Sequence, residues 1–197
     1  MNPKDLRYIK TEANLKAALL HLLEKRNIDE ISITGLCEAA ACSRNTFYQH
    51  YQSKDELFNA VMKDILSAID ESTQPIKEKQ TEVREDDIRE YTYKLLRVIN
   101  THRAELMSLR NCYDLFLLFL NDALYKSFLS HYEQKLHINQ ISEQGKLLTK
   151  YFCSGIAGFI EQWLSDSKVN LNKAQQILDQ CTRDNFRKMR DILIDAK

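Results

Sequence analysis

The sequence predicts an all-α protein of about nine helices, and three observations support this fold class. Only 4 Gly and 2 Pro occur among 197 residues, so the chain is poor in the residues that form turns and end strands. Apolar residues recur every three or four positions along most of the chain, which is the period of an amphipathic helix. The hydrophobic share of 44% and the charged share of 28% are those of a folded globular chain.

The first part of the chain contains both long and short helices. A long helix is expected over Asp5–Lys25, where apolar side chains repeat on one face. Two short helices follow, one after Ser32 and one over Ser43–His50, and each is preceded by a serine suited to an N-cap. Another long helix is expected over Lys54–Glu71, and it begins with the capping box Ser53-x-x-Glu56.

The second part of the chain begins after a polar stretch. Residues Ser72–Glu85 contain Pro75 and lack a clear period, so we interpret them as a linker. This linker divides the chain into two predicted domains, residues 1–71 and residues 72–197. Beyond it the helical period predicts further helices at about Ile88–His102, Arg103–Leu109, about Cys112–Gln134, Lys146–Ser165 and Asn170–Asp195.

Charge and cysteine content narrow the class of protein. The 28 basic and 28 acidic residues cancel, so the whole-chain charge indicates neither a nucleic-acid nor a membrane partner. Five cysteines without a Cys-x-x-Cys pair favour neither a disulfide framework nor a zinc site. We therefore expect no metal and no cofactor. No apolar stretch approaches the roughly 20 residues of a membrane span, so we expect a cytoplasmic protein without membrane contact.

Residues 31 to 57, ISITGLCEAAACSRNTFYQHYQSKDEL, are the most informative segment. The first short helix, with Leu36 and Ala40 on its apolar face, has room for only about two turns. Ser43 begins the second helix after a gap that only a sharp turn can fill. Two short helices joined by such a turn form a helix-turn-helix. In that motif the second helix enters the DNA major groove, leading with its N-terminal residues.

The polar face of the second short helix has the chemistry of DNA recognition. From Ser43 to Lys54 the segment contains two basic residues, Arg44 and Lys54, and no carboxylate. Arginine pairs with guanine, asparagine and glutamine pair with adenine, and hydroxyl groups bind phosphate oxygens. Lys54 begins the next helix, where its ammonium and the helix N-terminus suit a phosphate. The same pattern also fits a polar face that is merely solvated.

This segment resembles the DNA-binding domain of the tetracycline-repressor (TetR) family of bacterial regulators. The pattern that carries the resemblance follows a short capped helix and consists of Ser43, Thr46, Phe47, Tyr48, His50, Tyr51, Ser53, Lys54 and Leu57. The resemblance covers about residues 10–70 and is only architectural beyond Pro75. Two positions differ from the usual pattern: Ala41 replaces a glycine of the turn, and Gly35 replaces an acidic residue of the first helix.

The resemblance implies a role for each matching residue. Tyr48, His50 and Lys54 would hold the phosphate backbone, with Thr46 as a further contact. Arg44, Asn45 and Gln49 would read base edges, and Phe47 and Tyr51 would belong to the core. Together with Ser43 and the start of the preceding helix, the predicted DNA-binding residues are Ser32, Thr34, Ser43, Arg44, Asn45, Thr46, Tyr48, Gln49, His50 and Lys54.

For the second domain the resemblance implies an effector pocket and a homodimer. The predicted pocket residues are Tyr91, Met107, Tyr113, Phe116, Phe119 and Tyr151. The apolar surface of Lys146–Ser165 is broader than one neighbour would bury, which supports a contact with a second chain; a plain intrachain core is the alternative. The predicted interface residues are Gly155, Gly158, Phe159, Trp163, Ile177 and Cys181.

Three functions follow from these observations. The first is a sequence-specific DNA-binding transcriptional regulator, a dimeric repressor that a small-molecule effector releases from a pseudo-palindromic operator in double-stranded DNA. The second is a coactivator on the same scaffold, whose C-terminal domain binds a protein partner. The third is a helical enzyme, which is disfavoured because the sequence lacks GxSxG, phosphate-loop and HExxH motifs. We expect no enzymatic activity.

Overall fold

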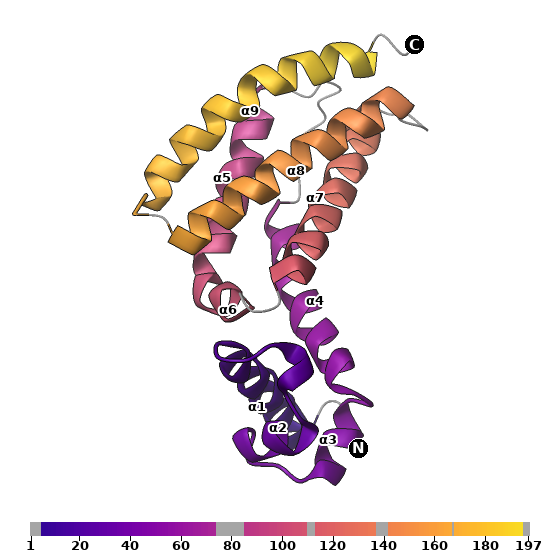
Figure 1. Ribbon diagram of the computed structural model, residues 1–197. Helices are drawn as coiled ribbons and strands as arrows, with labels where there is room; N and C mark the ends of the chain where they lie inside the picture. The colour runs from indigo at the N-terminus through magenta and orange to yellow at the C-terminus, as the bar shows by residue number, and fades with distance from the viewer. Residues whose placement is uncertain (1–4, 74–84, 110–112, 137–141, 167, 195–197) are drawn as a thin grey trace. The chain divides into compact units, whose positions relative to one another are not determined.

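The computed structural model describes residues 5–73, 85–109, 113–136, 142–166 and 168–194. Every regular element in these ranges is a helix, which confirms the predicted fold class (Figure 1). The α-helices are α1 (Leu6–Leu23), α2 (Ile33–Ala39), α3 (Arg44–His50), α4 (Lys54–Thr73), α5 (Glu85–Thr101), α6 (Arg103–Ser108), α7 (Tyr113–Leu136), α8 (Glu143–Asp166) and α9 (Leu171–Ile194).

One short element has no counterpart among the predicted helices. A single 3-10 turn, η1 (Ile28–Glu30), lies between α1 and α2. Asn27 and Glu30 cap it reciprocally, and the Asn27 N–H donates to Glu30 Oε2 over 3.0 Å. Three residues are too few to show a helical period. The only sequence signal for this turn is the Asn-x-x-Glu spacing of a capping box.

The chain packs as two compact units. The first comprises Met1–Ile65 and Ala104–Phe116, and the second comprises Leu66–Arg103 and Leu117–Lys197. Five side chains with no exposed surface form the centre of the first unit: Leu15, Leu19, Leu36, Phe47 and Leu57. In the second unit α9 packs against α5 and α8. The predicted boundary between residues 71 and 72 stays a prediction, and most of the predicted linker lies outside the described residues.

The capping box predicted for α4 forms only in part. The Glu56 N–H donates to Ser53 Oγ over 3.1 Å, as expected. The Glu56 carboxylate, however, accepts its hydrogen bond from the N–H of Gln52 at 2.6 Å, one residue before the predicted position. Both bonds still satisfy backbone N–H groups at the start of the helix, so the predicted beginning of α4 is correct while one partner differs.

A Schellman motif ends α2 and forms the turn of the helix-turn-helix. The Ala41 N–H donates to the Glu38 carbonyl over 3.2 Å, and the Cys42 N–H donates to the Cys37 carbonyl over 3.0 Å. These are the two bonds that define the motif. Ala41 has a φ of 51°, and it is the sole residue other than glycine with a positive φ in the described ranges. The alanine therefore occupies a left-handed position that glycine fills without strain.

Replacing Ala41 with Gly is expected to stabilise the protein by about 1 kcal/mol. The substitution removes roughly 1–2 kcal/mol of left-handed strain from the folded state. The greater entropy of glycine in the unfolded chain offsets roughly 0.4–1 kcal/mol of this gain. Ala39→Gly is the matched control: Ala39 is an exposed residue within α2, so the same change there should destabilise by about 1 kcal/mol. Urea unfolding followed by circular dichroism measures both changes. Equal destabilisation by the two variants would contradict the assigned strain.

Candidate nucleic-acid interface

Helix α3 begins with a well-formed N-cap. Ser43 has an extended backbone, and its Oγ accepts a hydrogen bond from the Thr46 N–H over 3.0 Å. The Ser43 and Thr46 hydroxyls also bond to each other over 2.8 Å. The predicted start of the second short helix is therefore correct. Both hydroxyl groups belong to this cap, and the cap fixes the orientation of the residues that follow it.

Four polar side chains share the exposed face of α3. Arg44, Asn45, Tyr48 and Gln49 are all exposed, and their spacing of one and four residues places them side by side on a helix. Phe47 lies on the opposite face with no exposed surface. In the described chain Arg44 takes part in no recorded ion pair, and α3 contains no acidic residue. This face thus presents one cation and several hydrogen-bonding groups to the surroundings.

The start of α2 is the second part of the predicted DNA interface. Ser32 caps the helix, because its Oγ accepts a hydrogen bond from the Gly35 N–H over 3.1 Å. Both Ser32 and Thr34 are exposed. An exposed hydroxyl at a helix N-terminus is suited to a phosphate oxygen, because the first N–H groups of the helix also point outward. The structure thus leaves both residues accessible for the predicted phosphate contacts.

The ring of His50 packs between α3 and α1. It stacks on Tyr8, with ring centroids 3.8 Å apart and an interplanar angle of 27°. Both ring nitrogens are buried without a hydrogen-bond partner from the described chain. This burial lowers the pKa of His50, although the charge of Glu12 opposes the shift. A phosphate contact by His50 stays a prediction, and it requires the ring to move away from Tyr8.

Lys54 is bound to the protein's own backbone. Its Nζ donates to the carbonyl oxygens of Ile28 at 2.7 Å, Asp29 at 3.1 Å and Ile31 at 3.2 Å. An ammonium group has three N–H donors, so these bonds account for all of them. The three carbonyls surround the end of η1, where the Ile28 oxygen also accepts the Ile31 N–H over 3.2 Å. The predicted phosphate contact of Lys54 stays a prediction, and the structure adds a role that the sequence did not reveal.

A chain of polar contacts fixes the end of α3 against α1 and α4. The Tyr51 hydroxyl donates to Glu12 Oε1 over 3.2 Å, and Lys16 Nζ lies 3.0 Å from the same oxygen. Lys16 also bonds Asp64 on α4 over 2.7 Å. Burial acts to raise the pKa of Glu12, but Lys16 and Tyr51 outweigh it and the pKa is lowered. Only the Glu12–Lys16 spacing of four residues signals this network in the sequence.

The predicted effector-pocket residues that the structure describes have different environments. Tyr91 is buried in the second unit with its ring 4.5 Å from that of Phe128, whereas Tyr151 is 70% exposed. Phe119 is partly exposed in the second unit, and Met107 belongs to the first unit. The side chains of Tyr113 and Phe116 lie outside the described part of the chain. The predicted effector pocket therefore stays a prediction.

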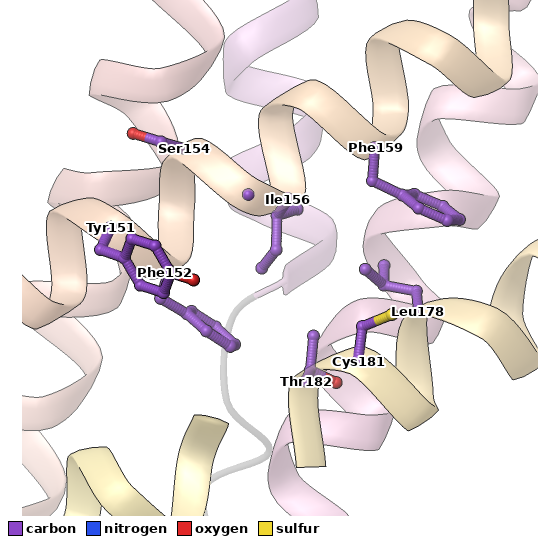
Figure 2. Close-up of a pocket in the computed structure, with 9 residues that line it drawn as sticks. Tyr151, Phe152, Ser154, Ile156, Phe159, Leu178, Cys181 and Thr182 are labelled. Atoms are coloured by element: carbon purple, nitrogen blue, oxygen red, sulfur yellow. The ribbon is translucent and has the colours of Figure 1, made fainter. Parts of the chain in front are cut away.

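An open groove of about 280 Å³ lies between α8 and α9, and most of its lining is apolar. Figure 2 shows Phe159 of α8 pointing toward Leu178 and Cys181 of α9 across this groove. Gly155 also lines it, and a Cβ added at Gly155 or Gly158 would meet no atom within 4 Å. Three of the predicted interface residues, Gly155, Phe159 and Cys181, thus share one surface with Tyr151.

Trp163 has a different environment from the other predicted interface residues. It is buried, and its indole N–H donates to the Val169 carbonyl over 2.9 Å. The Arg103 guanidinium lies 5.3 Å from the centre of its ring and donates to its carbonyl oxygen over 3.0 Å. These contacts hold Trp163 within its own unit, as the alternative of a plain intrachain core expects. Ile177 is partly exposed.

The fold and the exposed α3 face define a helix-turn-helix protein. Residues 15–61 match the model of the family described as bacterial regulatory proteins, tetR family. This match confirms, over residues 15–61, the resemblance seen in the sequence. No membrane-spanning helix is found in the described residues, nor is any group of three or more side chains able to hold a metal ion.

Solved structures with a similar fold include regulators named as members of the TetR family. A TetR-family regulator from Streptomyces coelicolor A3 is 12% identical with a TM-score of 0.64, covering 94% of this chain and 99% of its own. A TetR regulator from Streptococcus agalactiae is 19% identical with a TM-score of 0.63, covering 90% and 96%. A protein from Listeria innocua is 21% identical with a TM-score of 0.62, covering 93% and 94%. A search of curated protein sequences finds no match.

Proposed function

We propose that this protein is a sequence-specific DNA-binding repressor that acts as a homodimer and leaves its operator when a small molecule binds. The observation that carries this proposal is the exposed, acid-free face of α3. Arg44 suits a guanine, and Asn45 and Gln49 suit adenines in the major groove. Tyr48 can bond a phosphate beside them. Because Ser43 caps α3, these side chains project from a helix whose start is fixed.

The groove between α8 and α9 supports a homodimer. Tyr151 is 70% exposed and Leu147, four residues earlier, is 73% exposed, so an apolar stripe continues along α8 from the groove. The missing side chains at Gly155 and Gly158 leave open space there, which a helix of a second copy can fill. A symmetric dimer would present two α3 helices to half-sites about 34–36 Å apart on a pseudo-palindromic operator.

Release by an effector requires that the second unit influence the first. Helix α4 supports such coupling, because residues up to Ile65 belong to the first unit and those from Leu66 belong to the second. In the first unit, the Lys16–Asp64 bond connects α4 to α1 and, through Glu12, to the end of α3. An effector that binds better to a state with wrongly spaced α3 helices would shift the population away from DNA.

A titration of DNA by the full-length protein tests the proposal. The DNA that flanks the protein's own gene should bind tightly, with an affinity that falls as salt increases, and random DNA of equal length should bind much more weakly. A footprint with two related half-sites would support the dimer. Equal affinity for flanking and random DNA would overturn sequence-specific binding, and a transcription assay on the same DNA reports whether binding represses.

The proposed interface predicts a specific loss of dimerisation. Tyr151→Glu places a carboxylate in the stripe and should weaken self-association at least tenfold, because an unpaired charge is costly to bury. Tyr93→Glu is the matched control, because Tyr93 is an exposed tyrosine on α5 of the same unit. Analytical ultracentrifugation should show twice the chain mass of 23.1 kDa for the control. An unchanged dimer with Tyr151→Glu would place the interface elsewhere.

A further inference from the structure

The turn of the helix-turn-helix brings two cysteines together. Cys37 occupies the third position from the end of α2, and Cys42 follows the left-handed Ala41. In a Schellman motif, side chains at these two positions commonly contact each other. Burial raises the pKa of the Cys37 thiol, and the nearby Cys42 raises it further. The same backbone turn that orients α3 thus also brings the two cysteine residues together.

The backbone at the turn brings the two residues within the range of a disulfide. The Cys42 N–H lies 3.0 Å from the Cys37 carbonyl oxygen. With standard bond lengths, this distance limits the separation of their Cα atoms to about 6.9 Å at most. Cα atoms in disulfides usually lie about 4.4–6.8 Å apart. A disulfide between Cys37 and Cys42 therefore needs at most a small adjustment of the backbone.

We propose that Cys37 and Cys42 form a redox-active pair, which a low-molecular-weight disulfide oxidises to an intramolecular disulfide across the turn. The disulfide oxidant supplies the chemistry by thiol–disulfide exchange. Cys42 first gives up its proton. The resulting thiolate attacks one sulfur of the oxidant, and the other sulfur leaves as a thiol. The Cys37 thiolate then attacks the Cys42 sulfur and releases the second thiol. Two protein thiols are oxidised, and one oxidant disulfide is reduced to two thiols.

The environments of the two thiols indicate that Cys42 reacts first and Cys37 second. Cys42 is partly exposed and can meet an oxidant, whereas Cys37 is only 4% exposed. Burial raises the pKa of Cys37, and the neighbouring Cys42 raises it further, while the charge of Arg44 opposes both. A buried thiol with a raised pKa reacts poorly with a bulky oxidant. It is nevertheless well placed to attack the adjacent Cys42 sulfur once that sulfur is in a mixed disulfide.

The disulfide would act on the proposed DNA-binding function. Bonded sulfur atoms lie about 2.05 Å apart, which is closer than two thiols in contact. Closing the bond therefore moves Cys42 toward α2, and the next residue is Ser43, the N-cap of α3. A shifted α3 would lose base contacts. We expect an operator affinity about tenfold lower, the effect of roughly one lost base contact. This consequence rests on the proposed function, but the disulfide itself does not.

Mass spectrometry of the full-length protein tests the pair directly. Oxidised glutathione is added, remaining thiols are alkylated and each cysteine is assigned by peptide mapping. After cleavage at Glu38, which separates the two cysteines, we expect their peptides to be joined without attached glutathione, and dithiothreitol to reverse the bond. In Cys37→Ser, Cys42 should retain glutathione. In Cys42→Ser, Cys37 should remain reduced. Cys181→Ser removes an exposed thiol of the second unit and should leave the Cys37–Cys42 bond unchanged.

The outcomes separate the thiol pair from the DNA-binding function. Glutathione retained on Cys42 of the unaltered protein, or no reaction at all, would overturn the pair. A disulfide that forms without changing operator affinity would overturn only the proposed effect on α3. If the reduced protein binds operator and random DNA alike, the proposed function fails, and the peptide masses still decide whether the pair forms.

Discussion

Arg44→Ala is expected to weaken operator binding by roughly 1–3 kcal/mol and to leave binding to random DNA almost unchanged. The reason is geometric: Arg44 is the first residue of α3, it is exposed, and α3 holds no carboxylate to neutralise it. An arginine at the leading end of a reading helix can donate two bonds to one guanine. Fluorescence anisotropy with operator and random duplexes at fixed salt measures both affinities.

Arg97→Ala is the control for this experiment. Arg97 is an exposed arginine on α5 in the second unit, where it lies 5.7 Å from the centre of the Tyr93 ring. Its removal changes the net charge by the same amount without altering α3, so both duplexes should bind nearly as before. If Arg44→Ala weakens operator and random DNA equally, then Arg44 contacts a phosphate rather than a base.

The sequence predicted the helix-turn-helix well because its signals are local. Ser32 and Ser43 cap the two short helices at the expected positions, and each cap depends on residues no more than three positions away. Ala41 stands where the family pattern has a glycine, and its φ of 51° is the left-handed conformation that glycine favours. Local signals of this kind need no knowledge of the tertiary structure.

Contacts between distant residues could not be predicted in the same way. Tyr8 lies far before His50 in the chain, and no spacing rule relates residues so far apart. The partners of Lys54 are backbone carbonyls, which every residue has, so its side chain alone gave no reason to expect them. The same applies to the groove, because its lining comes from α8 and α9, and periodicity identifies an apolar face without naming its neighbour.

The contacts that the sequence did not predict have one consequence in common. They hold α3 in place and so support its exposed face. Stacking on Tyr8 holds His50, and hydrogen bonding to Glu12 holds Tyr51, at the end of the helix. Phe47 anchors its buried face. A helix held in this way loses little further freedom on binding, so more of its contact energy remains for recognition. The residues predicted to read bases are therefore supported by residues that lie outside the exposed face of α3.

Lys54→Ala is expected to destabilise the protein by about 2–3 kcal/mol in the absence of DNA, because bonds from a charged donor are worth more than neutral ones. The substitution removes the ammonium from three carbonyls, and the bonds to Ile28 and Ile31 are partly buried. The Ile28 oxygen would keep its bond from the Ile31 N–H, but both oxygens would lose the charged donor that offsets part of the cost of their burial. Thermal or urea unfolding followed by circular dichroism measures the loss.

Two further variants separate the ammonium from the rest of the side chain. Lys54→Met keeps an unbranched apolar stem and should lose nearly as much stability as Lys54→Ala, because the lost hydrogen bonds dominate. Lys63→Ala removes an exposed lysine from the same helix and should change stability by less than about 0.5 kcal/mol. Unfolding curves for Lys54→Ala that match those of the unaltered protein would show that the three carbonyl contacts contribute nothing. The role of Lys54 would then be limited to DNA, where its loss should weaken binding to all sequences alike.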